Sequence, residues 1–133
     1  MPLLIDTNIA IHLRDGDADV TARIVARRER PAISLVTLVE LEGGIYAHPE
    51  RIEGRKRGVV SLLRRVTVEP VDRVVVEAYG NIARHLGFSR RLILDRLIAA
   101  TAIVHDLTLV TINGDDFRDI PRLRLEAWPA PAQ

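Results

Sequence analysis

The sequence predicts an α/β protein with a central, mainly parallel sheet flanked by helices. Two observations predict this fold class. Short apolar segments of strand length alternate with longer segments whose apolar residues recur at helical spacing, and this alternation is typical of a parallel sheet with helical crossovers. Hydrophobic residues make up 47% of the 133 residues, which is enough for the core of a single domain spanning residues 1–133.

The predicted strands are short and apolar. The first is Leu3–Ile5, a run of three apolar residues that we expect to be fully buried. The others are predicted at Ala32–Leu35, Val66–Val71, Leu107–Thr111 and, as a last strand, Leu123–Ala127. Residues 129–133 are expected to form a tail.

The predicted helices lie between these strands. Helical spacing indicates helices at Asp17–Arg30, ended by Pro31, at Thr37–Tyr46, at Arg51–Arg65, which is basic and amphipathic, at Asp72–Leu86, ended by Gly87, and at Leu94–His105. The last of these is almost uniformly apolar, so we expect a central buried helix.

The composition excludes several classes of protein. The chain has no cysteine, hence no disulfide framework, thiolate metal site or cysteine nucleophile. No segment approaches the roughly 18 apolar residues of a membrane-spanning helix, and the N-terminus has no basic region typical of a signal peptide. We therefore expect a soluble, cytoplasmic protein with no membrane partner.

The net charge is only +1 and Lys56 is the only lysine. Arginine pairs well with phosphates, although a GC-rich genome produces the same bias.

Acidic residues stand at the edges of the apolar elements. Asp6 follows the first strand, Glu40 lies in the second helical segment, Asp95 begins the apolar helix, and Asp115 and Asp116 follow the strand that ends at residue 111. Strand ends and helix starts converge on one crevice in an open α/β sheet. Carboxylates gathered there repel one another unless a divalent cation with oxygen ligands neutralises them. The pattern therefore predicts a metal site.

Each acid also has a purely structural interpretation. Asp6 could cap a following helix, as could Asn8. Thr37 and Glu40 fit a capping box, and Asp95 could cap the apolar helix, where the helix dipole favours an anion. Asp115 and Asp116 could belong to a polar turn after Gly114. Capping, however, does not require these positions to converge, whereas a metal site does.

Four motifs resemble those of PIN-domain ribonucleases, and most closely the VapC-type toxins of bacterial toxin–antitoxin pairs. They are Asp6-Thr7-Asn8, Ser34-x-x-Thr37-x-x-Glu40-Leu41-x-x-Gly44, Asp95-x-x-Ile98-Ala99-Ala100-Thr101-Ala102 and Leu107-Thr108-Leu109-Val110-Thr111-x-Asn113-x-x-Asp116-Phe117. The resemblance implies a three-layer PIN-like fold and an endoribonuclease that requires Mg²⁺ or Mn²⁺. It also implies a homodimer, inhibition by a cognate antitoxin, and contact with operator DNA only through that antitoxin.

The resemblance assigns catalytic positions to Asp6, Glu40, Asp95 and Asp116. The fourth position varies in the family: an acid often stands where this chain has Asn113, and a variant pattern places it before the phenylalanine, where Asp116 stands beside Asp115. We expect Asp6 and Asp95 to be the metal ligands. Glu40 would bind through water or orient the nucleophile, and Asp116 would complete a second site, with Asp115 or a neutral Asn113 as alternatives.

RNA near such a site requires a basic rim. The candidates are Arg14, Arg90 and Arg91, and a cluster comprising Arg51, Arg55, Lys56 and Arg57, which could equally be a solvated helix face. The four histidines show no spacing typical of metal ligands.

Three other functions compete with the ribonuclease. The chain could be a non-catalytic interaction protein that acts with its antitoxin in DNA-binding autoregulation. It could be a DNA-directed nuclease of similar fold. An aspartyl phosphatase is the third possibility, but that chemistry typically uses a second aspartate two residues after the first, where this chain has Asn8.

Overall fold

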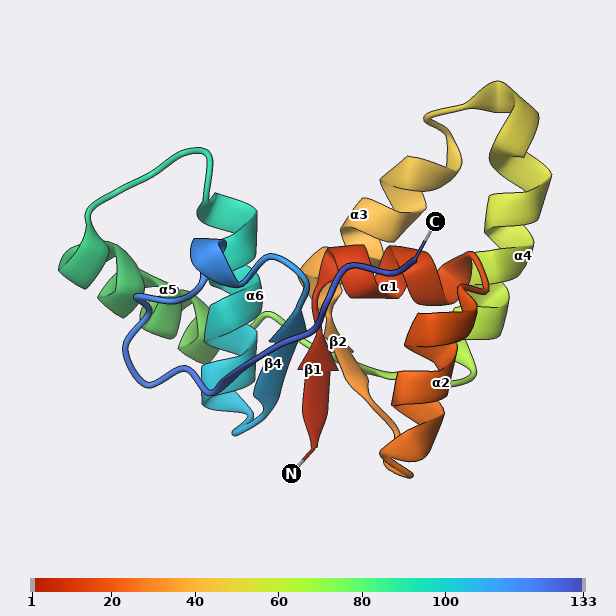
Figure 1. Cartoon of the computed structure of the whole chain (residues 1–133). Coiled ribbons are helices and arrows are strands. Elements are labelled where there is room, and N and C mark those ends of the chain that lie inside the picture. The colour runs from red at the N-terminus through yellow and green to blue at the C-terminus, as the bar shows by residue number, and fades with distance from the viewer. Residues whose placement is uncertain (1, 133) are drawn as a thin grey trace.

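Five parallel strands form the centre of the protein. The computed structural model describes residues 2–132 (Figure 1). The strands are β1 (Leu3–Ile5), β2 (Ala32–Ser34), β3 (Thr67–Glu69), β4 (Thr108–Thr111) and β5 (Leu125–Ala127), in the spatial order β3-β2-β1-β4-β5. Every neighbouring pair is parallel. The fold class predicted from the sequence is therefore confirmed.

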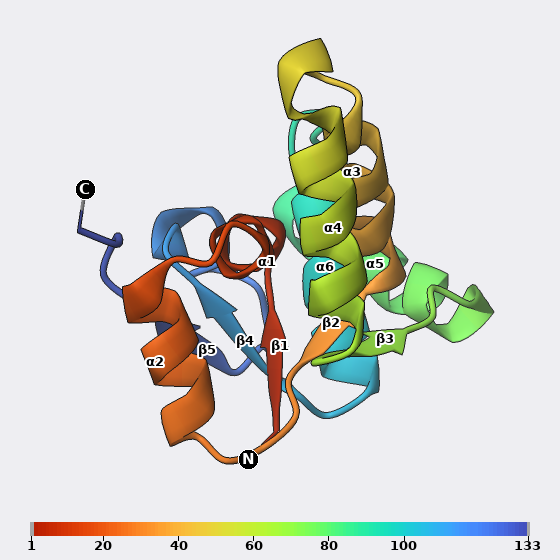
Figure 2. The ribbon, with the colours of Figure 1, turned by 90° about the vertical axis from the view of Figure 1, so that its right-hand side faces the viewer.

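Helices cover both faces of this sheet. Within residues 2–132 they are α1 (Thr7–Arg14), α2 (Ala18–Ala26), α3 (Leu35–Ile45), α4 (Ile52–Leu63), α5 (Arg73–Leu86) and α6 (Ile93–Val104), with short 3₁₀ turns η1 (Pro49–Arg51) and η2 (Gly114–Asp116). Figures 1 and 2 show α5 and α6 on one side of the strands, and α1 and α2 on the other with α3 and α4 rising beside them. None of these helices is long and apolar enough to cross a membrane.

Alternate residues of each strand enter two separate cores. Leu3 and Ile5 pack with α1 to α4, whereas Leu4 between them packs with α5 and α6. Val110 and Leu109 of β4 divide in the same way. This period of two is what a strand buried on both faces requires, and it establishes the three-layer arrangement.

The order of the strands creates a crevice above β1 and β4. From β1 the chain proceeds to β2 and β3 on one side, and then returns to β4 and β5 on the other. The switch in direction therefore falls between β1 and β4, which pair in register from Leu3 opposite Thr108 to Ile5 opposite Val110. Ligands of open α/β sheets bind outside the carboxyl ends of the strands at such a point.

The structure corrects several predicted boundaries. Helix α1 was not among the predicted helices, although Asp6 had been considered as a cap for one. Helix α2 is shorter than the predicted Asp17–Arg30, since it ends at Ala26 and Arg28 takes a left-handed φ of 58°. Pro31 therefore does not end it. The other elements agree to within a few residues, and Gly87 ends α5 with a φ of 85° that favours glycine.

Candidate active site

Asp6 stands at the carboxyl end of β1 and begins α1. Its side chain is 4% exposed. One carboxylate oxygen accepts a hydrogen bond from the backbone N–H of Ile9 at 2.9 Å, which makes Asp6 the N-cap of α1. The other oxygen accepts one from the Thr111 hydroxyl at 2.5 Å, at the end of β4. Asp6 is therefore both the N-cap of α1 and a candidate metal ligand. It follows β1 directly, and Thr111 of β4 holds its carboxylate in place.

Glu40 reaches the same crevice from α3. The Thr7 hydroxyl donates to Glu40 Oε1 at 2.7 Å, and it lies 3.0 Å from the Thr37 hydroxyl, which must then donate to Thr7. The capping-box interpretation of Thr37 and Glu40 is wrong, because α3 begins at Leu35 and its cap is Ser34, which accepts from the N–H of Val36. Glu40 therefore does not bond to the N-terminal end of its own helix, and it accepts a hydrogen bond from Thr7 at the start of α1 instead.

Asp95 lies in the first turn of α6 and has no bracing hydrogen bond. The helix begins after Leu92, so Asp95 is inside it and not at the cap position. No hydrogen bond to its side chain forms within residues 2–132. Burial raises the pKa of Asp95 above its ordinary value, and the charges of Asp116, Asp6 and Glu40 raise it further, whereas Arg91 lowers it. The cap interpretation of Asp95 is therefore wrong, and electrostatics couples it to all three other predicted acids.

Asp116 and Asp115 differ in their surroundings. Asp116 accepts a hydrogen bond from the Asn113 side chain at 3.3 Å and lies 3.8 Å from the guanidinium of Arg91. Asp115 pairs with Arg118 instead, and its side chain is 84% exposed. Of the two, Asp116 has the charge that acts on Asp95. Asn113 also connects to the Asp6 side of the crevice, because its backbone N–H donates to the Thr111 hydroxyl at 2.9 Å.

Burial and mutual repulsion act on these carboxylates together. Burial is the main cause of the raised pKa of Asp6, and Glu40 adds to it, while the hydrogen bonds from Ile9 and Thr111 lower it. Two buried or half-buried acids with raised pKa values in one crevice are typical of a functional site. A divalent cation would relieve both burial and repulsion by neutralising the charges.

The donor chemistry of the crevice fits Mg²⁺ or Mn²⁺. All the candidate ligands are carboxylate or amide oxygens, which hard cations prefer. Among residues 2–132, no three Asp, Glu or His side chains stand close enough to form a complete ligand group. Mg²⁺ keeps several waters and is usually held by one or two carboxylates. The residues therefore fit an ion bound partly through water.

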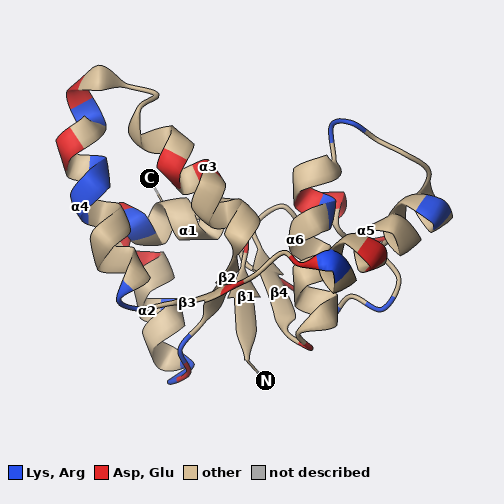
Figure 3. Ribbon diagram, turned by 180° about the vertical axis from the view of Figure 1, so that it is seen from behind, with Lys and Arg blue, Asp and Glu red and all other residues tan. Residues whose placement is uncertain are grey.

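Basic residues predicted for the rim of the site lie on two separate segments of the chain. Figure 3 shows Lys and Arg along α4 and on the loop between α5 and α6, the loop that carries Arg90 and Arg91. Arg14, predicted for the basic rim, is not available there, because its side chain is only 4% exposed and pairs with Asp15. It packs against Gly58, where an added Cβ would stand 2.8 Å from the Arg14 side chain. Arg14 is therefore a packing residue between helices.

Sequence reasoning missed the threonines that position the acids. Thr7, Thr37 and Thr111 each place a hydroxyl on Asp6, on Glu40 or on each other. The available signal was position: each lies within three residues of an acid or at the end of a strand. A hydroxyl and a carboxylate so placed in neighbouring elements of a parallel sheet are candidates for a hydrogen bond.

These features define an α/β protein with an acidic crevice at the switch point of a parallel sheet. The model of the PIN domain family matches residues 3–123, and the chain belongs to that family.

Within the PIN domain family, the chain is similar to relatives that are named as VapC ribonucleases. The chain is 36% identical over 115 residues to "Ribonuclease VapC10" of Mycobacterium tuberculosis, covering 84% of this chain and 82% of the relative. It is 29% identical over 134 residues to "Ribonuclease VapC2" of Rickettsia felis, covering 96% and 98%. The predicted resemblance to VapC-type PIN-domain ribonucleases is confirmed.

Solved structures agree with the fold. VapBC2 of Rickettsia felis, bound to a DNA fragment from its promoter, matches with a TM-score of 0.83 and 26% identity over 96% of this chain and 99% of that one. DNA-bound VapBC from Salmonella typhimurium matches with a TM-score of 0.81 and 27% identity, again over 96% and 99%.

Proposed function

We propose that this protein is a metal-dependent endoribonuclease, the toxin component of a type II toxin–antitoxin system, which hydrolyses RNA phosphodiester bonds in the cytoplasm. The observation that supports this most strongly is the electrostatic coupling of Asp95 to Asp6, Glu40 and Asp116 at the switch point of the sheet. The relatives named as VapC ribonucleases support the choice of RNA as the substrate.

Each acid has a role that follows from its surroundings. Asp6 and Asp95 hold the Mg²⁺ or Mn²⁺ ion, because they are the two whose burial raises the pKa and whose charge most needs compensation. Glu40, held by the Thr7 hydroxyl, accepts a proton from the attacking water or orients it. Asp116 completes the site opposite Asp95. When bound, the ion favours ionisation of a water and stabilises negative charge on the leaving oxygen.

The proposal includes two protein partners. An antitoxin covers the acidic crevice, and operator DNA is contacted only through it; matches to VapBC complexes, two of them DNA-bound, support this. A second copy of the chain forms a symmetric homodimer. Exposed apolar side chains on the helices beside the sheet support the dimer, among them Val39 at 64%, Val60 at 54% and Val76 at 50% exposure.

A nuclease assay tests the proposed activity directly. Purified chain is incubated with single-stranded RNA and with DNA of matched sequence, in Mg²⁺, in Mn²⁺ and in chelator. We expect RNA to be cut internally only when metal is present. The same preparation after Asp95→Asn is the control for a contaminating nuclease. An intact, folded chain that leaves RNA uncut in both metals would favour the alternative, a non-catalytic interaction protein acting with its antitoxin on DNA.

A growth assay tests the toxin role separately. Expression of the chain alone should arrest growth, and co-expression of a small gene adjacent to its own should relieve the arrest. Soluble wild-type protein that leaves growth unaffected would contradict the toxin role without bearing on the nuclease activity in vitro.

A further inference from the structure

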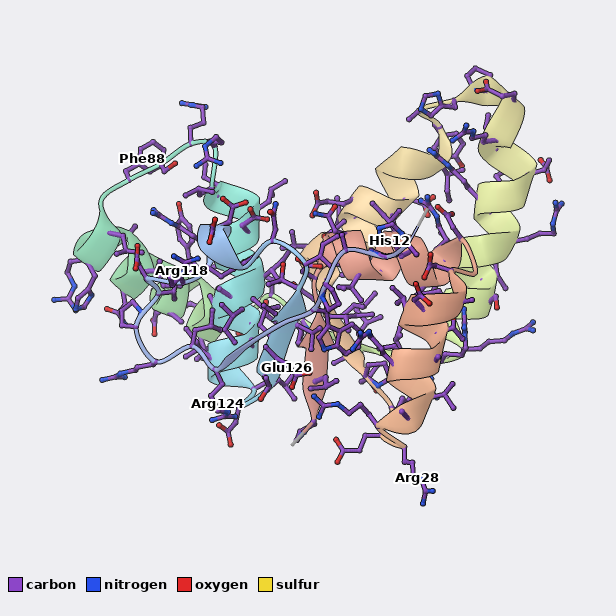
Figure 4. All side chains as sticks on the ribbon, viewed as in Figure 1. His12, Arg28, Phe88, Arg118, Arg124 and Glu126 are labelled. Carbon is purple, nitrogen blue, oxygen red and sulfur yellow. The ribbon has the colours of Figure 1, made fainter. Side chains whose placement is uncertain are left out.

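A pocket adjoins the carboxylate crevice and shares Asp116 with it. It has a volume of about 230 Å³, below the roughly 300–1,000 Å³ of pockets that hold drug-sized ligands, so it suits a fragment of the size of one nucleobase. It lies between the loop that carries Phe88 and the segment that carries Arg118, both labelled in Figure 4. Leu86, Leu92 and Ile120 supply apolar walls.

Arg96 lines this pocket, and most of its guanidinium donors have no hydrogen-bond partner. The residue is only 6% exposed, and the one hydrogen bond of its side chain within residues 2–132 goes from Nη1 to the carbonyl of Gly87 at 2.6 Å. An arginine has five N–H donors. Apart from His105 Nε2, every fully buried side-chain N or O atom of the described residues has a hydrogen-bond partner. The remaining Arg96 nitrogens therefore reach the solvent of the pocket.

Asp119, an exposed residue, lines the same pocket. Among the described residues it has no hydrogen-bond or ion-pair partner. The neighbouring acids are engaged, Asp115 with Arg118 and Asp116 with Asn113. Arg91, which also lines the pocket, lies 3.8 Å from Asp116. The guanidinium of Arg96 and the carboxylate of Asp119 are thus the two charged groups of the pocket that have no charged partner. Such an arrangement suits a ligand that offers hydrogen-bond acceptors to the guanidinium of Arg96 and hydrogen-bond donors to the carboxylate of Asp119.

We propose that this pocket is a subsite for one guanine base of the RNA, a step that rests on the proposed ribonuclease function. Guanine presents two adjacent acceptors, N7 and O6, which a guanidinium recognises bidentately. Its N1–H and N2 amino group are adjacent donors that suit one carboxylate. Bases of single-stranded RNA are bound on these edges, against a hydrophobic or planar wall. A phosphate would be repelled by Asp119, so a base fits the pair of side chains better.

Arg96 also has a structural role that must be separated from this one. Its bond to Gly87 places a positive charge at the C-terminal end of α5, where the helix dipole favours cations. This structural role at the end of α5 uses one N–H donor of Arg96 and requires only its positive charge. Base recognition requires the planar fork of donors as well, and it also requires Asp119, which contributes nothing to the end of α5.

The decisive experiment measures binding, so that it does not depend on cleavage. A labelled uridine hexamer carries a single guanine, moved through each position in turn, and its affinity is measured by fluorescence anisotropy in Mg²⁺ with the Asp6→Asn chain. One guanine position should tighten binding about 10-fold or more over uridine, the range of a bidentate base contact. Inosine, which lacks the N2 amino group, and 7-deazaguanine, which lacks N7, should each lose part of that gain.

Two variants assign the losses to the two side chains. Asp119→Ala should remove the preference for guanine over inosine. Arg96→Lys keeps the charge at α5 but loses the planar fork of donors, so it should weaken the preference for guanine over 7-deazaguanine. Glu53→Gln changes an exposed acid on α4 and should leave both preferences unchanged. Circular dichroism confirms that each variant is folded.

The outcomes for the subsite and for the nuclease are distinct. A guanine preference that follows Asp119 and Arg96 supports the subsite even if the wild type cuts no RNA, in which case only the proposed function fails. Equal binding of all hexamers, or a preference for guanine over inosine that survives Asp119→Ala, overturns the subsite even if the wild type is an active ribonuclease.

Discussion

The two sides of the acidic crevice are built by different means. On one side, Asp6 is buried and held by hydrogen bonds from Ile9 and Thr111. On the other, Asp95 is half-buried, its side chain has no hydrogen bond within the described residues, and its pKa is raised by burial first and then by the charges of the other acids. The first side is fixed by the fold before any ligand arrives. The second carries unrelieved repulsion, which binding of a cation would remove.

This difference explains how one crevice can be both stable and reactive. A carboxylate with satisfied hydrogen bonds contributes to folding, because its partners would otherwise be buried without acceptors. A carboxylate without them contributes little to folding and keeps its lone pairs for a ligand. Removing each acid in turn should therefore separate an effect on stability from an effect on metal binding.

The largest effect we predict is on catalysis, and it should be similar for the Asp6 side and the Asp95 side of the crevice. Asp6→Asn and Asp95→Asn should each reduce RNA cleavage by at least about 100-fold, since even outer-shell partners of metal ligands change activity by roughly 10–100-fold. The measurement is the rate of cleavage of a fluorogenic RNA in Mn²⁺. Asp115→Asn is the matched control and should cut at close to the wild-type rate, because Asp115 pairs with Arg118. Full activity in either of the first two variants would remove that residue from the site.

The next effect should distinguish the sides by stability alone. Asp6→Ala removes the N-cap of α1, which costs about 1 kcal/mol, and leaves the Thr111 hydroxyl buried without its acceptor, which costs about 1–3 kcal/mol. We expect a loss of at most about 2–3 kcal/mol, because removing the buried charge, whose burial raises the pKa of Asp6, offsets part of these costs. Asp95→Ala should change the free energy of unfolding little, because no hydrogen bond is lost and alanine favours the helix. Urea unfolding in chelator measures both, and equal losses would contradict the comparison.

Much of this fold could be predicted because its strands and helices have distinct periods. Leu3–Ile5 was predicted with its observed bounds, and Asp72 with Gly87 marked the ends of α5. Helix α1 was missed because its stretch after Asp6 is short, eight residues, and its start coincides with a motif that had been interpreted as chemistry. Arg28 was placed inside a helix because nothing in its residue type signals a left-handed φ.

The candidate site, too, could be predicted only in part from the sequence. The acids could be proposed from their positions at element edges and from the resemblance of the motifs. Their surroundings could not, because these depend on contacts distant in sequence: Thr111 lies 105 residues from Asp6, and Thr7 lies 33 from Glu40. Arg14 was predicted to belong to the basic rim because arginines are usually exposed. Its burial depends on Gly58 of another helix, which no local pattern reveals.

Metal binding should sharpen the comparison further. An ion that binds only the folded chain stabilises it by RT ln(1 + [L]/Kd), roughly 1.4–2 kcal/mol at ten to thirty times Kd. Millimolar Mn²⁺ should therefore raise the melting temperature of the wild type. It should raise that of Asp95→Asn scarcely at all, because a ligand is lost while the fold is intact. Glu53→Gln, with an exposed acid removed from α4, should respond like the wild type. Equal shifts in wild type and Asp95→Asn would show that the ion binds elsewhere.

The smallest predicted effect is the part of the pH dependence that Asp95 contributes, in addition to that of Asp6, whose pKa burial also raises. In chelator, the pKa of Asp95 is raised in the folded chain, by burial first and then by Asp116, Asp6 and Glu40, whereas an unfolded aspartate titrates near about 3.9. A raised folded pKa means that stability is highest below the unfolded pKa and is lost as the pH rises through the folded one.

Asp95→Asn does not undergo this loss, so its free energy of unfolding minus that of the wild type should increase with pH from about 4 upward and then level off. The increase should stay below about 1 kcal/mol, because solvent screens a half-buried group. Removing the opposing charge with Arg91→Ala in both chains should enlarge it, since Arg91 lowers the pKa of Asp95. Urea unfolding at closely spaced pH values provides the curve. A difference that is flat with pH, or one that Arg91→Ala reduces, would mean that the repulsion assigned to this side of the crevice is absent.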